Sequence, residues 1–127
     1  MTPSHEPLVR AEWVGPGTHI TAVGADGPEK RELELGLMRK ADKVVADRLE
    51  QCARLGEIHH ALEAGALRAN DVYAELGEIA AGLKPGRESD DEITIADLTG
   101  VGIQDAAVAS LAVETAMRRD LGKVLDI

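Results

Sequence analysis

The fold is decided by a stretch that reads Thr18-His19-Ile20-Thr21-Ala22-Val23 and runs on into Gly24-Ala25-Asp26-Gly27-Pro28-Glu29-Lys30. Its first six residues are rich in β-branched side chains and end at a glycine, which is typical of a strand that enters a turn. Similar short apolar runs follow at 43–47 and 93–96. Strands that alternate with helices favour parallel pairing through crossover connections. We therefore predict an α/β fold with a partial parallel sheet of about three strands.

Helical patterns occupy the segments between these strands. Residues 32–40 are predicted to be helical, and residues 48–67 carry an apolar stripe that two glycines, Gly56 and Gly65, weaken or interrupt. A further helix is expected after the capping pair Asn70-Asp71, with one face made of Val72, Leu76, Ile79 and Leu83. A long closing helix is predicted from Ile103 to about Arg119. Its inner side is expected to carry Ile103, Ala107, Leu111 and Met117.

Composition and charge exclude several classes of function. The net charge is -9, and the basic residues are interleaved with acidic ones, so neither nucleic acid nor a membrane surface is an expected partner. No apolar run reaches the roughly 18 residues of a membrane span. The single cysteine, Cys52, rules out an intrachain disulfide and is expected to be a buried apolar group. These features predict a cytoplasmic protein whose core is aliphatic, since phenylalanine is absent.

Polar residues and glycines follow each predicted strand. They are the segment 24–30, the single residue Asp47, and the segment 97–100. Ligands of parallel α/β sheets bind beyond the carboxyl ends of the strands, so these three places are the candidate site. The same residues also fit ordinary turns and helix caps, and the pattern alone leaves both interpretations open.

Several short motifs occur in a fixed order along the chain. They are Thr2-Pro3-Ser4, Pro16-Gly17-Thr18-His19-Ile20, Gly24-x-Asp26-x-Pro28-x-Lys30 with Glu32-Leu33, Glu75-Leu76-Gly77-Glu78-Ile79 and Ser89-Asp90-Asp91-Glu92-Ile93-Thr94. Together they resemble the later part of the ornithine cyclodeaminase/mu-crystallin family, as far as about residue 120. The segment 97–101 also resembles the branch of that family associated with ectoine breakdown.

This resemblance implies a function and a cofactor. Members of the family bind NAD or NADP in a Rossmann domain and hold a small amino-acid substrate on a separate N-terminal dimerisation domain. Ornithine cyclodeaminases oxidise the α-amine to an imine, close a ring with loss of ammonia, and return the hydride. Relatives act as alanine dehydrogenases or ketimine reductases, and mu-crystallins bind NADPH.

The resemblance also assigns roles to individual residues. Asp26 matches the acidic group that orients the reacting amine and moves protons, a role that suits a carboxylate. Lys30 and Thr99 are expected on the substrate and nicotinamide side. Residues expected to lie along the cofactor are Thr2, Pro3, Ser4, Val23, Gly24, Ala25 and Gly100. No metal is expected, because the adjacent histidines His59 and His60 would point about 100° apart on a helix.

Other family features are missing from the chain. Neither a glycine-rich phosphate loop nor the substrate domain is present, and Met1 falls inside a family motif. We therefore expect residues 1–127 to be the C-terminal part of a Rossmann domain, with its closing helix at about 103–121. Glu29 replaces a glycine of the family, and Leu98 a serine, which removes a hydroxyl contact.

Two functions are compatible with such a chain. The first is the nicotinamide-side half of an NAD-dependent cyclodeaminase-like enzyme, inactive alone and dependent on a complementary N-terminal chain or on homo-oligomers. The alternative is a non-catalytic remnant or a self-associating interaction module, in which an unpaired sheet edge drives association.

Overall fold

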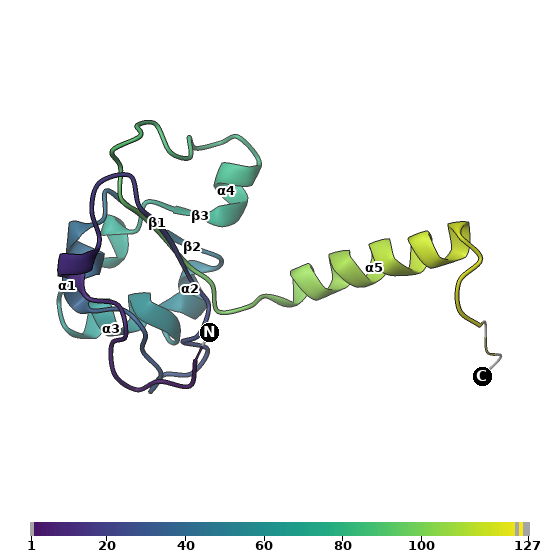
Figure 1. Cartoon of the computed structure of the whole chain (residues 1–127), viewed down its shortest axis with the longest axis horizontal. Helices are drawn as coiled ribbons and strands as arrows, with labels where there is room; N and C mark the ends of the chain where they lie inside the picture. Colours follow the sequence, from purple (N-terminus) through teal and green to yellow (C-terminus); the bar gives the residue numbers. More distant parts are fainter. Residues whose placement is uncertain (1, 124, 126–127) are drawn as a thin grey trace.

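A computed structural model describes residues 2–123 and 125. The elements are, in chain order, η1 (Ala11–Trp13), β1 (His19–Ala22), α1 (Leu35–Lys40), β2 (Lys43–Ala46), α2 (Leu49–Cys52), α3 (Gly56–Glu63), η2 (Ala69–Asp71), β3 (Ala74–Glu75), α4 (Leu76–Ala80), β4 (Thr94–Asp97) and α5 (Gly102–Arg118). Figure 1 shows a compact body that contains every strand, and α5 extending away from it.

The strands form one parallel sheet in the order β1-β4-β2-β3. β4 lies between β1 and β2, although it is the last strand in the sequence, so its four residues are buried on both faces. The α/β class, the parallel pairing and the three predicted strands are confirmed. The expected number of strands was too low, because β3 adds a fourth beside β2.

The segment that contains β3 was predicted as helix, and the first half of that prediction is wrong. Residues 69–71 form a 3-10 turn in which Asp71 accepts hydrogen bonds from Arg68. The chain then extends, and the Tyr73 amide donates to the Val44 carbonyl at 2.8 Å. Backbone pairing with β2 thus overrides the helical spacing. The helix begins only at Leu76, where Glu75 and Glu78 form a capping box.

The predicted helix over 48–67 is two helices, α2 and α3, separated at Gly56. Gly56 has a φ of +78°, which L-residues with side chains rarely adopt. A Cβ atom there would lie 2.6 Å from Asp97 Oδ2, so the close approach of β4 also requires glycine. Gly65, with a φ of +63°, lies just beyond the end of α3. The interruption expected at these two glycines is confirmed.

The core lies between one face of the sheet and the helices α1 and α3. Leu37, Met38 and Ile58 are at most 2% exposed and pack with Ile95 of β4. Burial of such a side chain stabilises the fold by roughly 2 kcal/mol. Cys52 is fully buried in the same cluster, as predicted.

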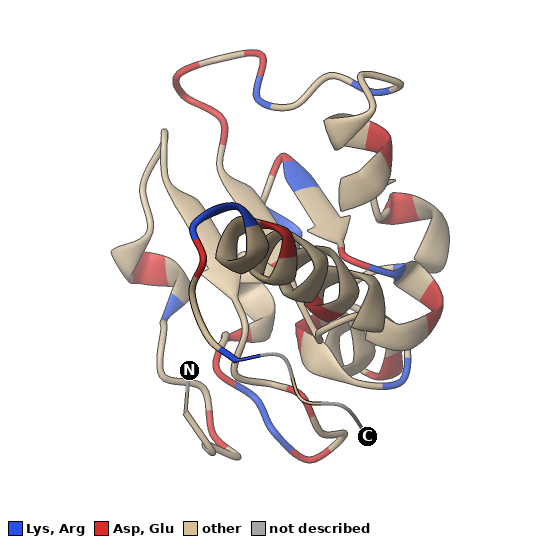
Figure 2. Cartoon of the chain, turned by 90° about the vertical axis from the view of Figure 1, so that its right-hand side faces the viewer, with Lys and Arg blue, Asp and Glu red and all other residues tan. Residues whose placement is uncertain are grey.

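The closing helix forms as predicted, over 102–118, but its expected inner side is wrong. Ile103, Leu111 and Met117 are 73%, 64% and 73% exposed, and Ala107 is exposed as well. The helix extends away from the body, so this apolar stripe packs against none of the described residues. None of the described helices is long and apolar enough to cross a membrane. Charges of both signs are scattered over the loops and short helices rather than gathered into one basic surface (Figure 2).

Candidate functional site

The carboxyl ends of three strands lie side by side at one edge of the sheet. The register pairs Ala22 of β1 and Ala46 of β2 with the same residue of β4, Asp97. The segments that follow these strands, 23–30, 47–48 and 98–101, therefore leave the sheet at one edge. This is the place where parallel α/β sheets bind ligands.

The segment 23–30 forms a turn closed by an ion pair. Lys30 Nζ donates to Asp26 Oδ1 at 2.5 Å, and the Lys30 amide donates to the Gly27 carbonyl. The hydrogen bond from Lys30 holds the pKa of the Asp26 carboxyl below its ordinary value, and Asp26 raises the pKa of Lys30. The Asp26 side chain is 58% exposed. Asp26 is thus an exposed carboxylate at the rim of the sheet, paired with Lys30.

The carboxylate of Glu32 fastens this turn to the N-terminal segment. Glu32 accepts hydrogen bonds from the Gly24 amide at 3.0 Å, from the Thr2 amide at 2.7 Å and from the Thr2 hydroxyl at 2.8 Å. Burial raises the pKa of Glu32, but the hydrogen bonds from Thr2 and Gly24 outweigh burial, so the pKa is lowered on balance. A Cβ atom on Gly24 would overlap this carboxylate, which explains the glycine.

A second carboxylate, Asp47, organises the segment after β4. Its Oδ2 accepts the amides of Thr99 and Gly100, each at 2.8 Å, and its Oδ1 accepts the Thr99 hydroxyl. Gln51 Nε2 donates to Thr99 Oγ1 and to the Gly100 carbonyl. Gly100 has a φ of +85° and an exposed backbone. Asp47 therefore acts as an anchor that fixes the Thr99–Gly100 backbone.

Two further carboxylates, Glu57 and Asp97, are buried beneath these loops. Glu57 accepts the amides of Glu32 and Leu33, and Asp97 Oδ2 accepts the amide of Ile58. Burial raises the pKa of both, that of Asp97 to about 7. Their shared role is to hold the start of α3 against β4 and the 23–32 segment.

The sequence does not indicate that these four carboxylates anchor the backbone around the site. Asp47 follows β2 and Asp97 ends β4, so both could be noticed as candidates, although their hydrogen bonds show them to be scaffold groups. Glu32 lay inside a motif without an assigned role. Glu57 carried no signal, because its partners are backbone amides about 25 residues away in sequence.

The predicted site residues fall into two groups. Thr2 and Ser4 lie against the 23–32 segment, since the Arg31 amide donates to the Ser4 carbonyl, whereas Pro3 is exposed. Within the turn, Val23 is 40% exposed and Ala25 only 3%. Thr99 and Gly100 form the second group, held by Asp47 and Gln51. The first group lies around the turn after β1 and is anchored by Glu32, whereas the second group follows the neighbouring strand β4 and is anchored by Asp47.

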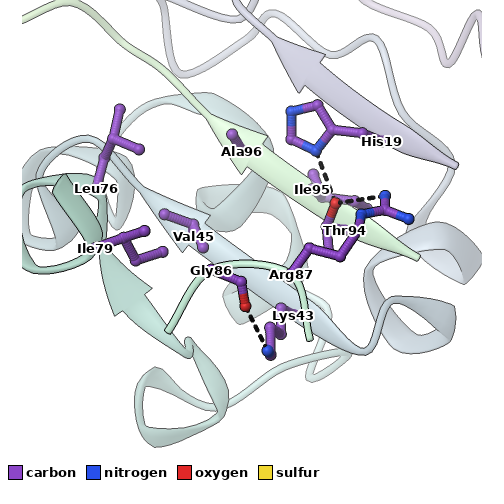
Figure 3. Close-up of a pocket in the computed structure, with 10 residues that line it drawn as sticks. All are labelled: His19, Lys43, Val45, Leu76, Ile79, Gly86, Arg87, Thr94, Ile95 and Ala96. Atoms are coloured by element: carbon purple, nitrogen blue, oxygen red, sulfur yellow. Dashed lines mark hydrogen bonds between the residues drawn. The ribbon is translucent and has the colours of Figure 1, made fainter. Parts of the chain in front are cut away.

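A separate pocket of about 220 Å³ lies between α4 and the strands β1, β4 and β2 (Figure 3). It is lined by His19, Lys43, Val45, Leu76, Ile79, Gly86, Arg87, Thr94, Ile95 and Ala96. The polar groups are committed to protein partners: Lys43 pairs with Glu88, and Thr94 Oγ1 bonds His19 and Arg87. This lining shares no residue with the predicted site, so the pocket is a separate surface.

Comparison with known proteins decides the family. The model of the ornithine cyclodeaminase/mu-crystallin family matches residues 1–120. The chain belongs to this family. Among curated members, the alanine dehydrogenase of Archaeoglobus fulgidus is 54% identical over 121 residues, which cover 95% of this chain and 37% of that protein.

Solved structures of family members share the fold. An archaeal alanine dehydrogenase dimer with bound NAD superimposes with a TM-score of 0.90 and 52% identity, covering 99% of this chain and 39% of that one. The iminosuccinate reductase of Paracoccus denitrificans in complex with NAD+ superimposes with a TM-score of 0.91 and 42% sequence identity. That match covers 100% of this chain and 38% of the reductase chain. The parallel sheet is therefore Rossmann-like, as predicted. The chain spans about two fifths of the length of the family members it matches.

Proposed function

We propose that this chain supplies the nicotinamide side of an NAD-dependent enzyme that interconverts the amine and imine of a small amino acid. The remaining part of the active site, with the glycine-rich phosphate loop and the substrate domain, would come from a complementary segment or chain. The observation that carries the proposal is the Asp26–Lys30 turn at the same sheet edge as Thr99–Gly100, within a fold shared with NAD-bound relatives.

The residues at this edge fit the nicotinamide end of the cofactor. Val23 offers an exposed apolar side chain, Gly100 offers backbone that a ligand can approach closely, and Asp26 offers an accessible carboxylate. Thr2 to Ser4 would lie on the other side of the turn. Hydrogen bonds to the Glu32 carboxylate fix Thr2 and Gly24, and those to Asp47 fix Thr99 and Gly100, so this backbone requires little reorganisation when ligands bind.

In the proposed reaction Asp26 acts as a general base. Bound NAD would supply the acceptor for the hydride that leaves the amine-bearing carbon. Asp26 accepts a proton from that amine, so the carbon–nitrogen bond becomes a double bond while charge is balanced. Lys30 positions the Asp26 carboxylate through the ion pair. A substrate with a second amine could then close a ring, with loss of ammonia and return of the hydride, whereas a simple amino acid would give a hydrolysable imine.

The substrate class follows from what the relatives share by name. Alanine dehydrogenase and iminosuccinate reductase both act at a carbon–nitrogen bond next to a carboxylate. We therefore assign this chain to amine oxidation or imine reduction in general, with ornithine-type cyclodeamination as the special case. Because the matched relatives carry most of their length outside the region shared with this chain, the substrate specificity would reside in that other part.

The test is a chimera with the complementary part of a relative. The portion of the Archaeoglobus fulgidus alanine dehydrogenase outside the matched region is fused to this chain, and NADH formation is measured with alanine and ornithine. We expect Asp26→Asn to lower turnover by about 100-fold or more, as for loss of a general base, with unchanged NAD affinity. The matched control is Glu29→Gln, an exposed carboxylate in the same turn, which should leave turnover nearly intact. Equal turnover in wild type and Asp26→Asn would remove Asp26 from this role.

One observation favours the second candidate, self-association. Four apolar side chains of α5 have exposed fractions of 56–73%: Val108, Leu111, Val113 and Met117. Light scattering of the purified chain distinguishes the two functions. A stable oligomer that Leu111→Glu dissociates, in a chain that neither binds NAD nor activates a complementary part, would favour the interaction module. A monomer that gains activity on complementation would favour the enzyme component.

A further inference from the structure

Three potential metal ligands lie on α3, next to the turn that carries Lys30. They are His59, His60 and Glu63, and one ligand atom from each lies within 4.8 Å of the other two. His59 Nε2 and Glu63 Oε2 are 3.5 Å apart. The two imidazole rings lie with their centroids 5.2 Å apart and their planes tilted by 54°. The sequence predicts no metal here because adjacent histidines diverge on a helix, yet one nitrogen of each ring lies within 4.8 Å of the other.

One ring nitrogen of each histidine is hydrogen-bonded to a backbone carbonyl group. His59 Nδ1 bonds the Ala53 carbonyl at 3.2 Å, and His60 Nε2 bonds the Lys30 carbonyl at 2.7 Å. A carbonyl oxygen only accepts, so each of these nitrogens carries the proton. The lone pairs are then on His59 Nε2 and His60 Nδ1. Metal-binding histidines are typically oriented in this way, with the second nitrogen donating to a carbonyl or carboxylate.

The surroundings suit an ion that is accessible from solvent. The His59 side chain is 17% exposed, and that of Glu63 is 68% exposed. His60 is half-buried as well, so both rings are restrained more than the exposed carboxylate, which can rotate toward an ion. Donor atoms around a tetrahedral zinc ion lie roughly 3.3 Å apart, given bond lengths of about 2.0–2.1 Å. Rotation of the exposed Glu63 side chain and small movements of the rings would shorten the present donor separations, which are up to 4.8 Å, to this spacing.

We propose that His59 Nε2, His60 Nδ1 and a carboxylate oxygen of Glu63 bind one divalent transition-metal ion, with water in the remaining position. Two imidazoles and a carboxylate are a donor set for Zn²⁺, and also for Ni²⁺ and Cu²⁺. The ion would have a structural consequence. Because His60 holds the carbonyl of Lys30, metal binding would fasten α3 to the turn that carries Asp26.

Calorimetric titration of the metal-free 127-residue chain with ZnCl₂ tests the proposal. We expect one ion per chain with a Kd on the order of 10 μM, weaker than four-ligand structural sites. His59→Gln and Glu63→Gln should each weaken binding about tenfold or more. Glu63→Gln is the safer variant, because Glu63 is exposed and its removal leaves the core unchanged. In parallel, Co²⁺ should give an intense visible absorption band typical of low-symmetry coordination, and Glu63→Gln should reduce it.

Matched controls separate this site from general histidine and carboxylate binding. His5→Gln removes an exposed histidine, and Glu50→Gln removes an exposed carboxylate on α2. Both should bind Zn²⁺ as the wild type does. Absence of saturable binding up to about a hundredfold above the expected Kd, or equal weakening in the control variants, would overturn the proposal.

Discussion

The substitution Gly56→Ala tests how the buried carboxylates hold the site together. The residue has a φ of +78°, and its added Cβ would lie 2.6 Å from Asp97 Oδ2 and 2.8 Å from Oδ1. Alanine in the left-handed region costs about 1–2 kcal/mol. Displacement of the Asp97 carboxyl also breaks its hydrogen bond to Ile58, which leaves a buried group unsatisfied at a cost of about 1–3 kcal/mol. We expect a total loss of about 2–5 kcal/mol.

The matched control is Gly65→Ala. Gly65 has a similar φ of +63°, but nothing lies within 4 Å of its Cβ position. It should lose only the backbone part, about 1–2 kcal/mol. Urea unfolding followed by far-UV circular dichroism measures both free energies of unfolding. Losses that agree within about 0.5 kcal/mol would refute the role of the Gly56–Asp97 approach, because that agreement is within the error of additivity.

Two further predictions concern buried titratable groups. Because burial raises the pKa of Asp97 from 3.8 to about 7, the folded chain binds this proton more tightly than the unfolded chain, so its contribution to stability is greatest at low pH and falls as the pH rises through 4 to 7. The free energy of unfolding should therefore decline more steeply over this range in the wild type than in Asp97→Asn; parallel profiles would show that Asp97 titrates normally. Burial also raises the pKa of the Cys52 thiol to about 12, so iodoacetamide should label Cys52 only after unfolding in urea. Rapid labelling of the folded chain would contradict its burial.

The sequence was sufficient to predict the sheet that positions the site. β-branched and apolar runs located β1, β2 and β4 within one residue at each end. The signal is physical for β2 and β4, whose residues are all buried. The missed strand, β3, is only two residues long, Ala74–Glu75, and owes its conformation to pairing with β2. Local propensity contains no information about that pairing.

The inner side assigned to α5 failed for a different reason. The stripe of Ile103, Leu111 and Met117 correctly indicates an apolar face, but the described residues provide nothing that covers it. Periodicity predicts that a face is apolar, not where its partner lies. The carboxylates that anchor the site could not be predicted either. A carboxylate that accepts hydrogen bonds from backbone amides can lie at any distance in sequence from those amides. Glu57 is the clearest example.

The most direct test of the nicotinamide-side assignment is to map NAD onto the chain by amide chemical shifts. The ¹⁵N-labelled chain is combined with the complementary part of the Archaeoglobus relative, and NAD is added. We predict that the largest shifts occur at Gly24, Ala25 and Gly100, at the carboxyl edge of β1 and β4, and that residues around His19 and Lys43 in the separate pocket remain unchanged. Shifts confined to that pocket, or absent at saturating NAD, would contradict the assignment.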